Sequence, residues 1–342
     1  MEYEYFPDYN YTDDNVTIYD APVFTPQTTC WNKVWCVSLM VVSVVIFLMG
    51  FFGNALVILI SGFKMRKTVN TTWYLSLAIS DFVFCAFLPF SIAYTAMDDW
   101  IFGRFMCKFC STIMFLNMFS SIFLLVIISA DRCVSVMFPV WAQNQRTVKK
   151  ASVVVALAWF FAIALSAPSV IFREVRNHLG RTTCFNHYEL HPHSQRIVAV
   201  SRFVAGFVVP FFIIMLCYSV IMSKLRTNRM TKSKRPFKVM TALVVAFFIC
   251  WLPYHVFVLL ELNHSHYDHS ILVAGLQVGT AMAAANSFLN PVLYVFIGND
   301  FKQTFKNSVL SKMENAMGED GRTTSRYLSR SISIDGRAST HI

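Results

Sequence analysis

A single carboxylate inside an apolar stretch is the feature of this sequence that most directly suggests chemistry. Asp81 is the one charged residue between Thr72 and Met97. An ionisable group in membrane hydrocarbon costs at least ~2.5–3.5 kcal/mol, which favours a functional role. Amide and hydroxyl side chains at similar depth in other apolar stretches are Asn54, Asn117, Ser121, Asn286 and Asn290. Such oxygen ligands suit a hard cation such as Na⁺, and the alternative is a structural hydrogen-bond network between helices.

Asp131 and Arg132 place opposite charges side by side where the apolar stretch Phe109–Ala130 ends. At a membrane surface this pair can be a solvated helix end and nothing more. Facing a partner protein, it can instead act as a lock that opens when the helices move. The sequence alone leaves both roles open.

Prolines inside the apolar stretches provide hinges, because proline removes a helix hydrogen bond and kinks the helix. These residues are Pro89, Pro168, Pro210, Pro253 and Pro291. Trp251 places a large ring beside the hinge at Pro253. Transporters also use broken helices, so the hinges alone do not separate the two classes.

Seven stretches long enough to cross a bilayer must position these residues, since a spanning helix needs about 20 mostly apolar residues. Six of them lack Asp, Glu, Lys and Arg: Val34–Phe63, Phe109–Ala130, Ala151–Phe172, Phe203–Ser223, Val239–Leu260 and His269–Asn299. The seventh, Thr72–Met97, carries Asp81. Only 14% of the chain is charged, against roughly 25% in soluble domains. We therefore predict an all-α membrane protein with a seven-transmembrane helix bundle, because Gly and Pro are scattered through the spans rather than bounding short strands.

The charge of the chain is divided between the two sides of this bundle. The connections and tail on one side sum to +15, and those on the other sum to −4. Cytosolic segments carry the excess of Lys and Arg, which predicts an extracellular N-terminus and a cytosolic C-terminus in a multi-pass protein of the cell membrane. The pI of about 9.2 is therefore a topology signal and does not indicate nucleic-acid binding.

Outer-side chemistry agrees with this orientation. Asn10, Asn15 and Asn263 each begin an Asn-x-Ser/Thr glycosylation sequon on the predicted outer side. Cys107 and Cys184 also lie on that oxidising side, where a bridge between them would pin the loop 173–202 to the third span. Most other cysteines lie in or near spans and are expected to act as small apolar fillers.

The C-terminal part divides into an amphipathic segment and a polar tail. Apolar residues recur every four positions from Phe301 to Met313 with lysines between them, which predicts a short helix over 299–313 on the membrane lipid. The tail 314–342 carries candidate phosphorylation sites at Thr323, Thr324, Ser325, Ser329, Ser331 and Ser333. Disordered filler is the alternative for this tail.

The order of these motifs resembles that of rhodopsin-like (class A) G-protein-coupled receptors, over about residues 33–313. One motif falls in each span: Gly53-Asn54, Leu77 to Asp81, Cys107 with Asp131-Arg132-Cys133, Trp159, Pro210 with Tyr218, Cys250-Trp251-Leu252-Pro253, and Asn290-Pro291-Val292-Leu293-Tyr294. The resemblance implies a receptor whose partners are a heterotrimeric G protein, arrestin and receptor kinases. No nucleophile–base or metal set of an enzyme is visible.

The resemblance also implies roles for these residues. Trp251 would be a toggle, and Arg132 with Tyr218 and Tyr294 would rearrange to admit the G protein. An allosteric Na⁺, with no other cofactor, would be held by Asp81, Asn117, Ser121, Asn286 and Asn290. Cys107 and Cys184 would be bridged. The chain departs from the pattern at Cys133, where tyrosine is usual, and this leaves the strength of coupling open.

Within the class, the sequence is most similar to chemoattractant receptors and to the chemerin receptor group. The carrying segments are 63–70, 131–141, 172–174, 184–186, 235–238 and 259–262. Formyl-peptide receptors share much of this but carry an acid where this chain has Phe115. The resemblance implies a secreted peptide or protein ligand, chemerin-like, and an inhibitory-type G protein. Alternatives are a formyl-peptide, anaphylatoxin or lipid-mediator ligand, or a non-signalling decoy; a transporter or channel would need an internal repeat, and none is visible.

Two arginines are candidates for binding a ligand carboxylate, which the guanidinium fork fits. Arg202 begins the fifth span, Arg173 ends the fourth, and Glu261 opposes them from the sixth. Their alternative role is that of interfacial residues that reach toward water. The other candidate ligand-binding residues are Tyr94, Phe115, His255 and Gln277.

We thus expect four parts. Residues 1–33 form an acidic, tyrosine-rich extracellular arm that attracts basic partners, and 34–298 form the bundle. Residues 299–313 form the membrane-surface helix, and 314–342 the disordered tail.

Overall fold

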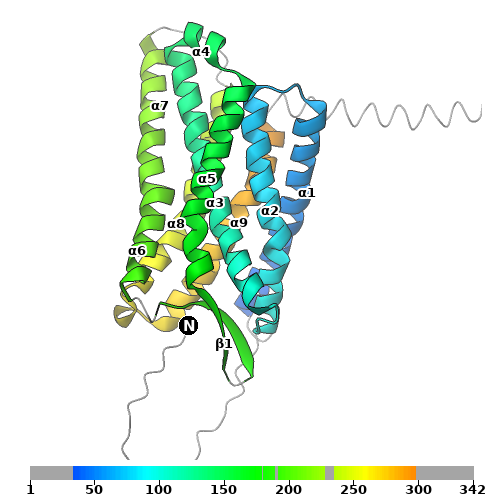
Figure 1. Ribbon diagram of the computed structural model, residues 1–342, viewed down its shortest axis with the longest axis vertical. Coiled ribbons are helices and arrows are strands. Elements are labelled where there is room, and N and C mark those ends of the chain that lie inside the picture. The colour runs from blue at the N-terminus through cyan, green and yellow to red at the C-terminus, as the bar shows by residue number, and fades with distance from the viewer. Residues whose placement is uncertain (1–33, 179, 189–191, 228–234, 298–342) are drawn as a thin grey trace, which may run out of the picture.

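The computed structural model describes residues 34–178, 180–188, 192–227 and 235–297. Seven helices are long and apolar enough to cross a membrane, and they stand side by side in one bundle (Figure 1). They are Val34–Lys64, Val69–Met97, Gly103–Met137, Val148–Phe172, His193–Lys224, Val239–Glu261 and His269–Leu293. The predicted all-α membrane bundle is confirmed. The predicted arm 1–33, surface helix 299–313 and tail 314–342, with Asn10, Asn15 and the phosphorylation sites, lie outside the described residues.

The elements follow one another as α1 (Val34–Leu59), a π-helical turn (Ile60–Lys64), α2 (Val69–Met97), α3 (Gly103–Met137), α4 (Pro139–Gln145), α5 (Val148–Phe172), β1 (Arg173–His178), β2 (Arg181–Asn186), α6 (Pro192–Phe203), a second π-helical turn (Val204–Val208), α7 (Val209–Thr227), α8 (Arg235–Glu261), a short 3₁₀ turn (His264–His266) and α9 (His269–Ile297). The strands pair antiparallel, with Val175 opposite Cys184. The hairpin lies at one end of the bundle and α4 at the other (Figure 1). We call these the hairpin end and the α4 end.

Polar side chains define where the helices at the α4 end begin. The Thr68 hydroxyl accepts a hydrogen bond from the Thr71 backbone N–H, while the Thr71 hydroxyl accepts one from the Thr68 N–H, so a capping box starts α2. Thr147 caps α5 in the same way, accepting from the Lys150 N–H. These caps fix the first turns of α2 and α5, the two helices whose starts lie at the α4 end.

The bundle is apolar outside and carries its polar side chains inside. Phe52, Phe160 and Leu216 are about two-thirds exposed, whereas Asp81 and Asn54 are fully buried. This inversion suits a lipid environment, where an exposed apolar side chain costs nothing and a polar group needs a partner inside the bundle.

The structure corrects the expected start of the fifth span. The charge-free run predicts a start at Phe203 with Arg202 at its mouth, but the helix begins at Pro192 and places Arg202 nearly three turns inside it. Polar residues in 192–201 continue the helix beyond the hydrocarbon, so the length of an apolar run understates the helix. The hairpin and α4 were likewise not predicted.

Candidate functional site

The Asp81 carboxylate is the centre of a buried polar cluster between α2, α3 and α9. Its Oδ1 accepts from the Asn117 amide at 2.9 Å, and its Oδ2 accepts from the Asn290 amide at 2.7 Å. Ser287 donates to the Asn117 Oδ1 at 3.3 Å. Three of the residues predicted for a cation site therefore meet in one place.

Two further predicted members of this cluster have oxygen atoms to spare. Ser121 and Asn286 are almost fully buried, and the Ser121 Oγ and Asn286 Oδ1 have no hydrogen-bond partner among the described residues. A buried oxygen without a partner is unfavourable, and a small cation would satisfy such atoms. The donor set therefore fits the implied Na⁺.

Sequence reasoning found Ser121 but missed Ser80, Ser120 and Ser287. Ser80 and Ser120 join α2 to α3 through an Oγ–Oγ contact of 2.5 Å, and the Asn117 amide also donates to Ser80 at 3.2 Å. Serines are common in spans, and their spacing of one or three residues from Asp81 and Asn117 was the signal that could have identified them.

Arg202 lies buried near the hairpin end with its guanidinium on an aromatic ring. Its Cζ is 3.4 Å from the Phe115 ring centroid, and its Nη2 donates to Ser169 at 2.8 Å. Its Nε has no hydrogen-bond partner in the part of the chain that the structure describes. The cation–π contact and the bond to one hydroxyl leave some N–H groups of the guanidinium without an acceptor. This buried cation can therefore bind an anionic group.

Arg173 provides a second cation to the same region. It donates to the Asn186 Oδ1 at 3.1 Å, while its Nε has no hydrogen-bond partner among the residues described. Burial lowers the pKa of the Arg173 guanidinium, and the nearby Arg202 charge acts in the same direction. Within the described residues neither arginine forms an ion pair with a carboxylate, which leaves two like charges close together.

Of the other four predicted ligand-binding residues, three lie near Arg202 and Arg173 and one is exposed. Tyr94 lies within electrostatic reach of Arg173, and Phe115 lies under Arg202. His255 is buried, with its ring centroid 5.6 Å from that of Phe203. Gln277 is exposed on α9.

Tyr188 follows the hairpin and joins this region, although sequence reasoning did not select it. Burial raises the pKa of its hydroxyl, Arg202 and Arg173 lower it, and Glu261 raises it. Tyr188 thus lies within electrostatic reach of both cations and of Glu261, at the end of α8.

Aromatic rings connect this region to the bundle core. The Tyr254 ring contacts Phe115 at 6.1 Å and Trp251 at 5.8 Å between centroids, and Trp251 contacts Phe247 at 6.0 Å. Trp251 is 1% exposed and lies two residues before Pro253 in α8. Contacting aromatic rings therefore connect Arg202 to the part of α8 that contains Pro253.

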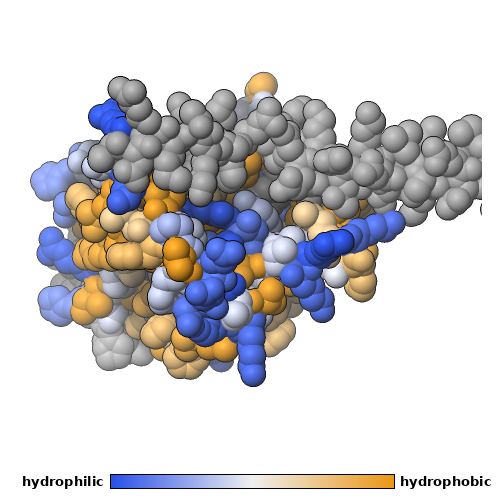
Figure 2. Space-filling view, turned by 90° about the horizontal axis from the view of Figure 1, so that it is seen from above, coloured by the Kyte–Doolittle hydropathy of each residue, from blue (hydrophilic) through white to orange (hydrophobic). Residues whose placement is uncertain are grey.

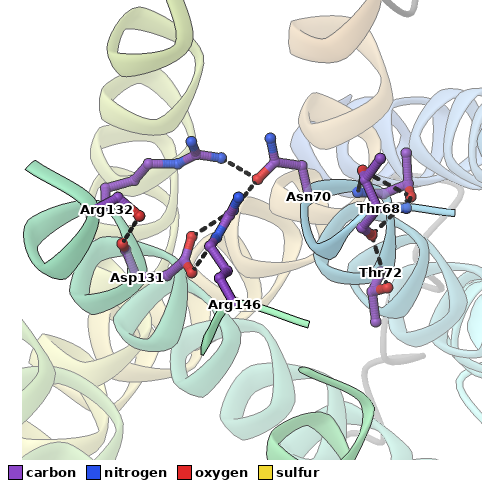
Figure 3. Close-up of polar contacts among 8 residues, drawn as sticks. Thr68, Asn70, Thr72, Asp131, Arg132 and Arg146 are labelled. Atoms are coloured by element: carbon purple, nitrogen blue, oxygen red, sulfur yellow. Dashed lines mark hydrogen bonds and ion pairs between the residues drawn. The ribbon is translucent and has the colours of Figure 1, made fainter. Parts of the chain in front are cut away.

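The α4 end holds the predicted switch residues. Asp131 forms an ion pair with Arg146, and the Asn70 Oδ1 accepts from Arg132 (Figure 3). The Tyr218 hydroxyl lies 3.4 Å from Thr241. Pro291 packs against Gly53, whereas the Tyr294 side chain lies outside the described residues.

Seen from the α4 end, hydrophilic side chains gather over the described surface (Figure 2). Basic residues in the two connections there are exposed: Lys64, Arg66, Lys67, Lys149 and Lys150. This end thus carries the positive charge that the sequence predicts for one side of the bundle.

Comparison with known proteins decides the class. Residues 53–294 match the model of the 7 transmembrane receptor (rhodopsin family). The chain belongs to this rhodopsin family of receptors. The predictions of a receptor and of a protein that is not an enzyme are therefore confirmed.

Full-length relatives place the receptor among the chemerin-like receptors. It is 44% identical to Chemerin-like receptor 1 of Sus scrofa, with 92% of each chain covered. It is 42% identical to Chemerin-like receptor 1 of Mus musculus, with 100% of this chain and 98% of the relative covered. Formyl peptide receptor 2 of Mus musculus is 38% identical, with 91% of each chain covered.

At the hairpin end of the receptor, a disulfide joins Cys107 of α3 to Cys184 of β2, as predicted. Most of the cysteines in the described spans are free, as predicted, whereas Cys36 is disulfide-bonded. Lys108 and Arg104 of α3 pair with Glu174 of β1 at 2.8 and 2.6 Å. The hairpin is thus fixed to the first turns of α3 by one covalent and two ionic contacts.

The ionic contacts of the receptor's hairpin are expected to persist in mild acid. The hydrogen bond from Arg104 lowers the pKa of Glu174 to about 2 from its ordinary 4.5, with Lys108 acting in the same direction. Because this pKa is depressed on folding, its stabilising contribution is present above about pH 4.5 and is lost as the pH falls from there toward 2. Hydrogen exchange of β1 amides, corrected for intrinsic rates, should therefore be equal at pH 7.4 and 5.5, and Glu174→Gln should accelerate it at both. A slower-exchanging β1 at pH 7.4 than at 5.5 in the unmodified receptor would contradict this.

Proposed function

We propose that this receptor detects a secreted chemerin-like chemoattractant and signals through an inhibitory-type G protein. The observation that carries the proposal is the pair of arginines, the buried Arg202 and the partly buried Arg173, which have no carboxylate partner among the described residues. A carboxyl-terminal group of the ligand would supply that partner. The chemerin-like relatives support the choice of ligand.

The ligand would enter at the hairpin end, which we propose to be extracellular. Positive charge at the α4 end supports this orientation, because cytosolic segments carry the excess of Lys and Arg. The acidic arm 1–33 would then hold the body of a basic ligand outside the cell. The α4 end would face the G protein, and the C-terminal tail would face receptor kinases and arrestin.

Binding would favour one of two arrangements of the bundle. A carboxylate on Arg202 displaces part of its contact with Phe115, and the rings of Tyr254 and Trp251 connect that site to the kink at Pro253. Arg132 and Tyr218 would change partners at the other end of the same helices.

The experiment is nucleotide exchange on an inhibitory-type G protein in membranes that contain the full-length receptor. Chemerin is expected to stimulate exchange, and pertussis toxin to abolish it. A formylated tripeptide is expected to be inactive, because the side chain beside Arg202 is the hydrophobic Phe115 and not the acid that formyl-peptide receptors carry at this position. Stimulation by the formylated peptide alone would reject the chemerin proposal in favour of a formyl-peptide ligand.

We also propose that Na⁺ binds at Asp81 and opposes activation, since it would hold α2, α3 and α9 together. Agonist affinity should fall about fivefold or more when NaCl replaces an organic chloride salt at constant ionic strength, a typical coupling between two sites. Asp81→Asn should remove this dependence. Ser76→Ala is the matched control, because Ser76 is a buried α2 residue bonded to Trp159 and not to Asp81. Sodium dependence that survives in Asp81→Asn would refute the site.

A further inference from the structure

Asp131 is paired across the α4 end and not with its neighbour in sequence. The Arg146 Nε lies 2.7 Å from the Asp131 Oδ1, and the Arg146 Nη2 lies 2.8 Å from its Oδ2. Both carboxylate oxygens therefore face one guanidinium in a bidentate pair, the strongest geometry for this interaction. Arg132 is adjacent to Asp131 in α3 but takes a different acceptor.

That acceptor is a neutral amide. The Oδ1 of Asn70 accepts hydrogen bonds from the Nη2 atoms of both Arg132 and Arg146 (Figure 3). A neutral oxygen binds a guanidinium less strongly than a carboxylate does. It also brings two like charges together, because both guanidiniums donate to the same oxygen. Arg132 is thus held by a weaker contact than the one that holds Asp131.

The backbone fixes both partners of this arrangement. Arg146 is the C-cap residue directly after α4, where its N–H donates to the Ala142 carbonyl at 3.0 Å, and Thr147 then caps α5. Asn70 lies two residues after Thr68 in the capping box of α2. Three elements, α2, α3 and the α4–α5 connection, therefore meet at the Asn70 oxygen.

We infer that Arg146 is a positioning residue for G-protein coupling: it holds the Asp131 carboxylate away from Arg132, so that Arg132 is restrained by the neutral Asn70 and is easily released. This inference rests on the proposed function, in which Arg132 engages the G protein. It assigns Asn70 the role of setting how firmly Arg132 is held.

Substitutions at Arg146 test the first half of the inference. Arg146→Ala leaves Asp131 without its partner and next to Arg132, so chemerin-stimulated nucleotide exchange should fall about fivefold. In the Asp131→Asn background the same substitution should have little further effect, because no carboxylate remains to capture Arg132. Interactions between contacting residues produce such non-additivity. Arg181→Ala, which removes an exposed arginine at the opposite, hairpin end, is the matched control and should leave exchange unchanged.

Substitutions at Asn70 test the second half, because they should act in opposite directions. Asn70→Asp puts a carboxylate beside Arg132 and should lower exchange about fivefold, whereas Asn70→Ala should raise agonist-free exchange. Surface expression and chemerin binding of each variant show that it is folded. A fivefold loss from Arg146→Ala in both backgrounds, or losses of equal size from Asn70→Asp and Asn70→Ala, would overturn the inference alone. Failure of the unmodified receptor to stimulate exchange would overturn the proposed function, and the inference with it.

Discussion

Replacing Arg202 with alanine is expected to reduce the potency of chemerin about 30-fold or more while the receptor still reaches the cell surface. The Arg202 guanidinium is buried, stacked on Phe115 and bonded to Ser169, and its Nε has no hydrogen-bond partner within the described ranges. Removing one partner of a buried, hydrogen-bonded charge pair costs roughly 2–5 kcal/mol, which corresponds to at least about 30-fold in affinity. The substitution leaves the ligand carboxylate in a buried region without its cation.

The free receptor should tolerate this change. Among the described residues Arg202 has no carboxylate partner, so its removal orphans the Ser169 hydroxyl and leaves no buried anion unpaired. Potency is measured as chemerin-stimulated nucleotide exchange, and expression by surface labelling. Arg181→Ala is the matched control, because Arg181 pairs with Asp98 on the exposed part of the hairpin end. Full chemerin potency in Arg202→Ala, or an equal loss in Arg181→Ala, would reject Arg202 as the carboxylate anchor.

The bundle was predictable from the sequence because the bilayer imposes a minimum length on each apolar run. Asp81, Asn117 and Asn290 were found for the same reason, since a polar residue in hydrocarbon is rare and needs a partner. The bounds of the fifth helix were not predictable, because the polar residues that precede Arg202 extend the helix beyond the membrane. Hydropathy indicates whether lipid or water surrounds a helix. It does not indicate the residues at which the backbone hydrogen bonds of the helix begin and end.

Partners that depend on tertiary contact were beyond the sequence. Asp131 and Arg132 are neighbours in the chain, which suggests a pair, but the carboxylate instead faces Arg146, which lies 15 residues later. The connection through α4 brings that guanidinium back to α3, and nothing in the local pattern predicts the return. The exposed position of Gln277 has the same origin, because the rotation of α9 is set by its packing against other helices.

Replacing Cys184 with serine is expected to be the most damaging change within the hairpin itself. The disulfide closes a separation of 77 residues between Cys107 and Cys184, and cross-links over such loops stabilise soluble proteins by about 4 kcal/mol. In a bilayer the spans between the two cysteines stay inserted even in the unfolded receptor. The unfolded chain has therefore already lost much of the conformational entropy that a disulfide would remove. The loss should therefore fall mainly on the hairpin, which precedes Tyr188 and carries Arg173 in β1.

The expected result is a loss of chemerin affinity of about tenfold or more, together with a lower thermal unfolding midpoint, in Cys184→Ser. The double variant with Cys107→Ser should be no worse than the single one, because either substitution removes the same bond and the two effects cannot add. Cys110→Ser is the control, since Cys110 is a free, half-buried thiol of α3, and it should change neither quantity. The ion pairs of Glu174 with Arg104 and Lys108 remain in all these variants. The variants therefore measure how well these ionic contacts hold the hairpin in place without the disulfide. Unchanged affinity in Cys184→Ser would mean that those contacts suffice and that the covalent link is not needed to present Arg173 to the ligand.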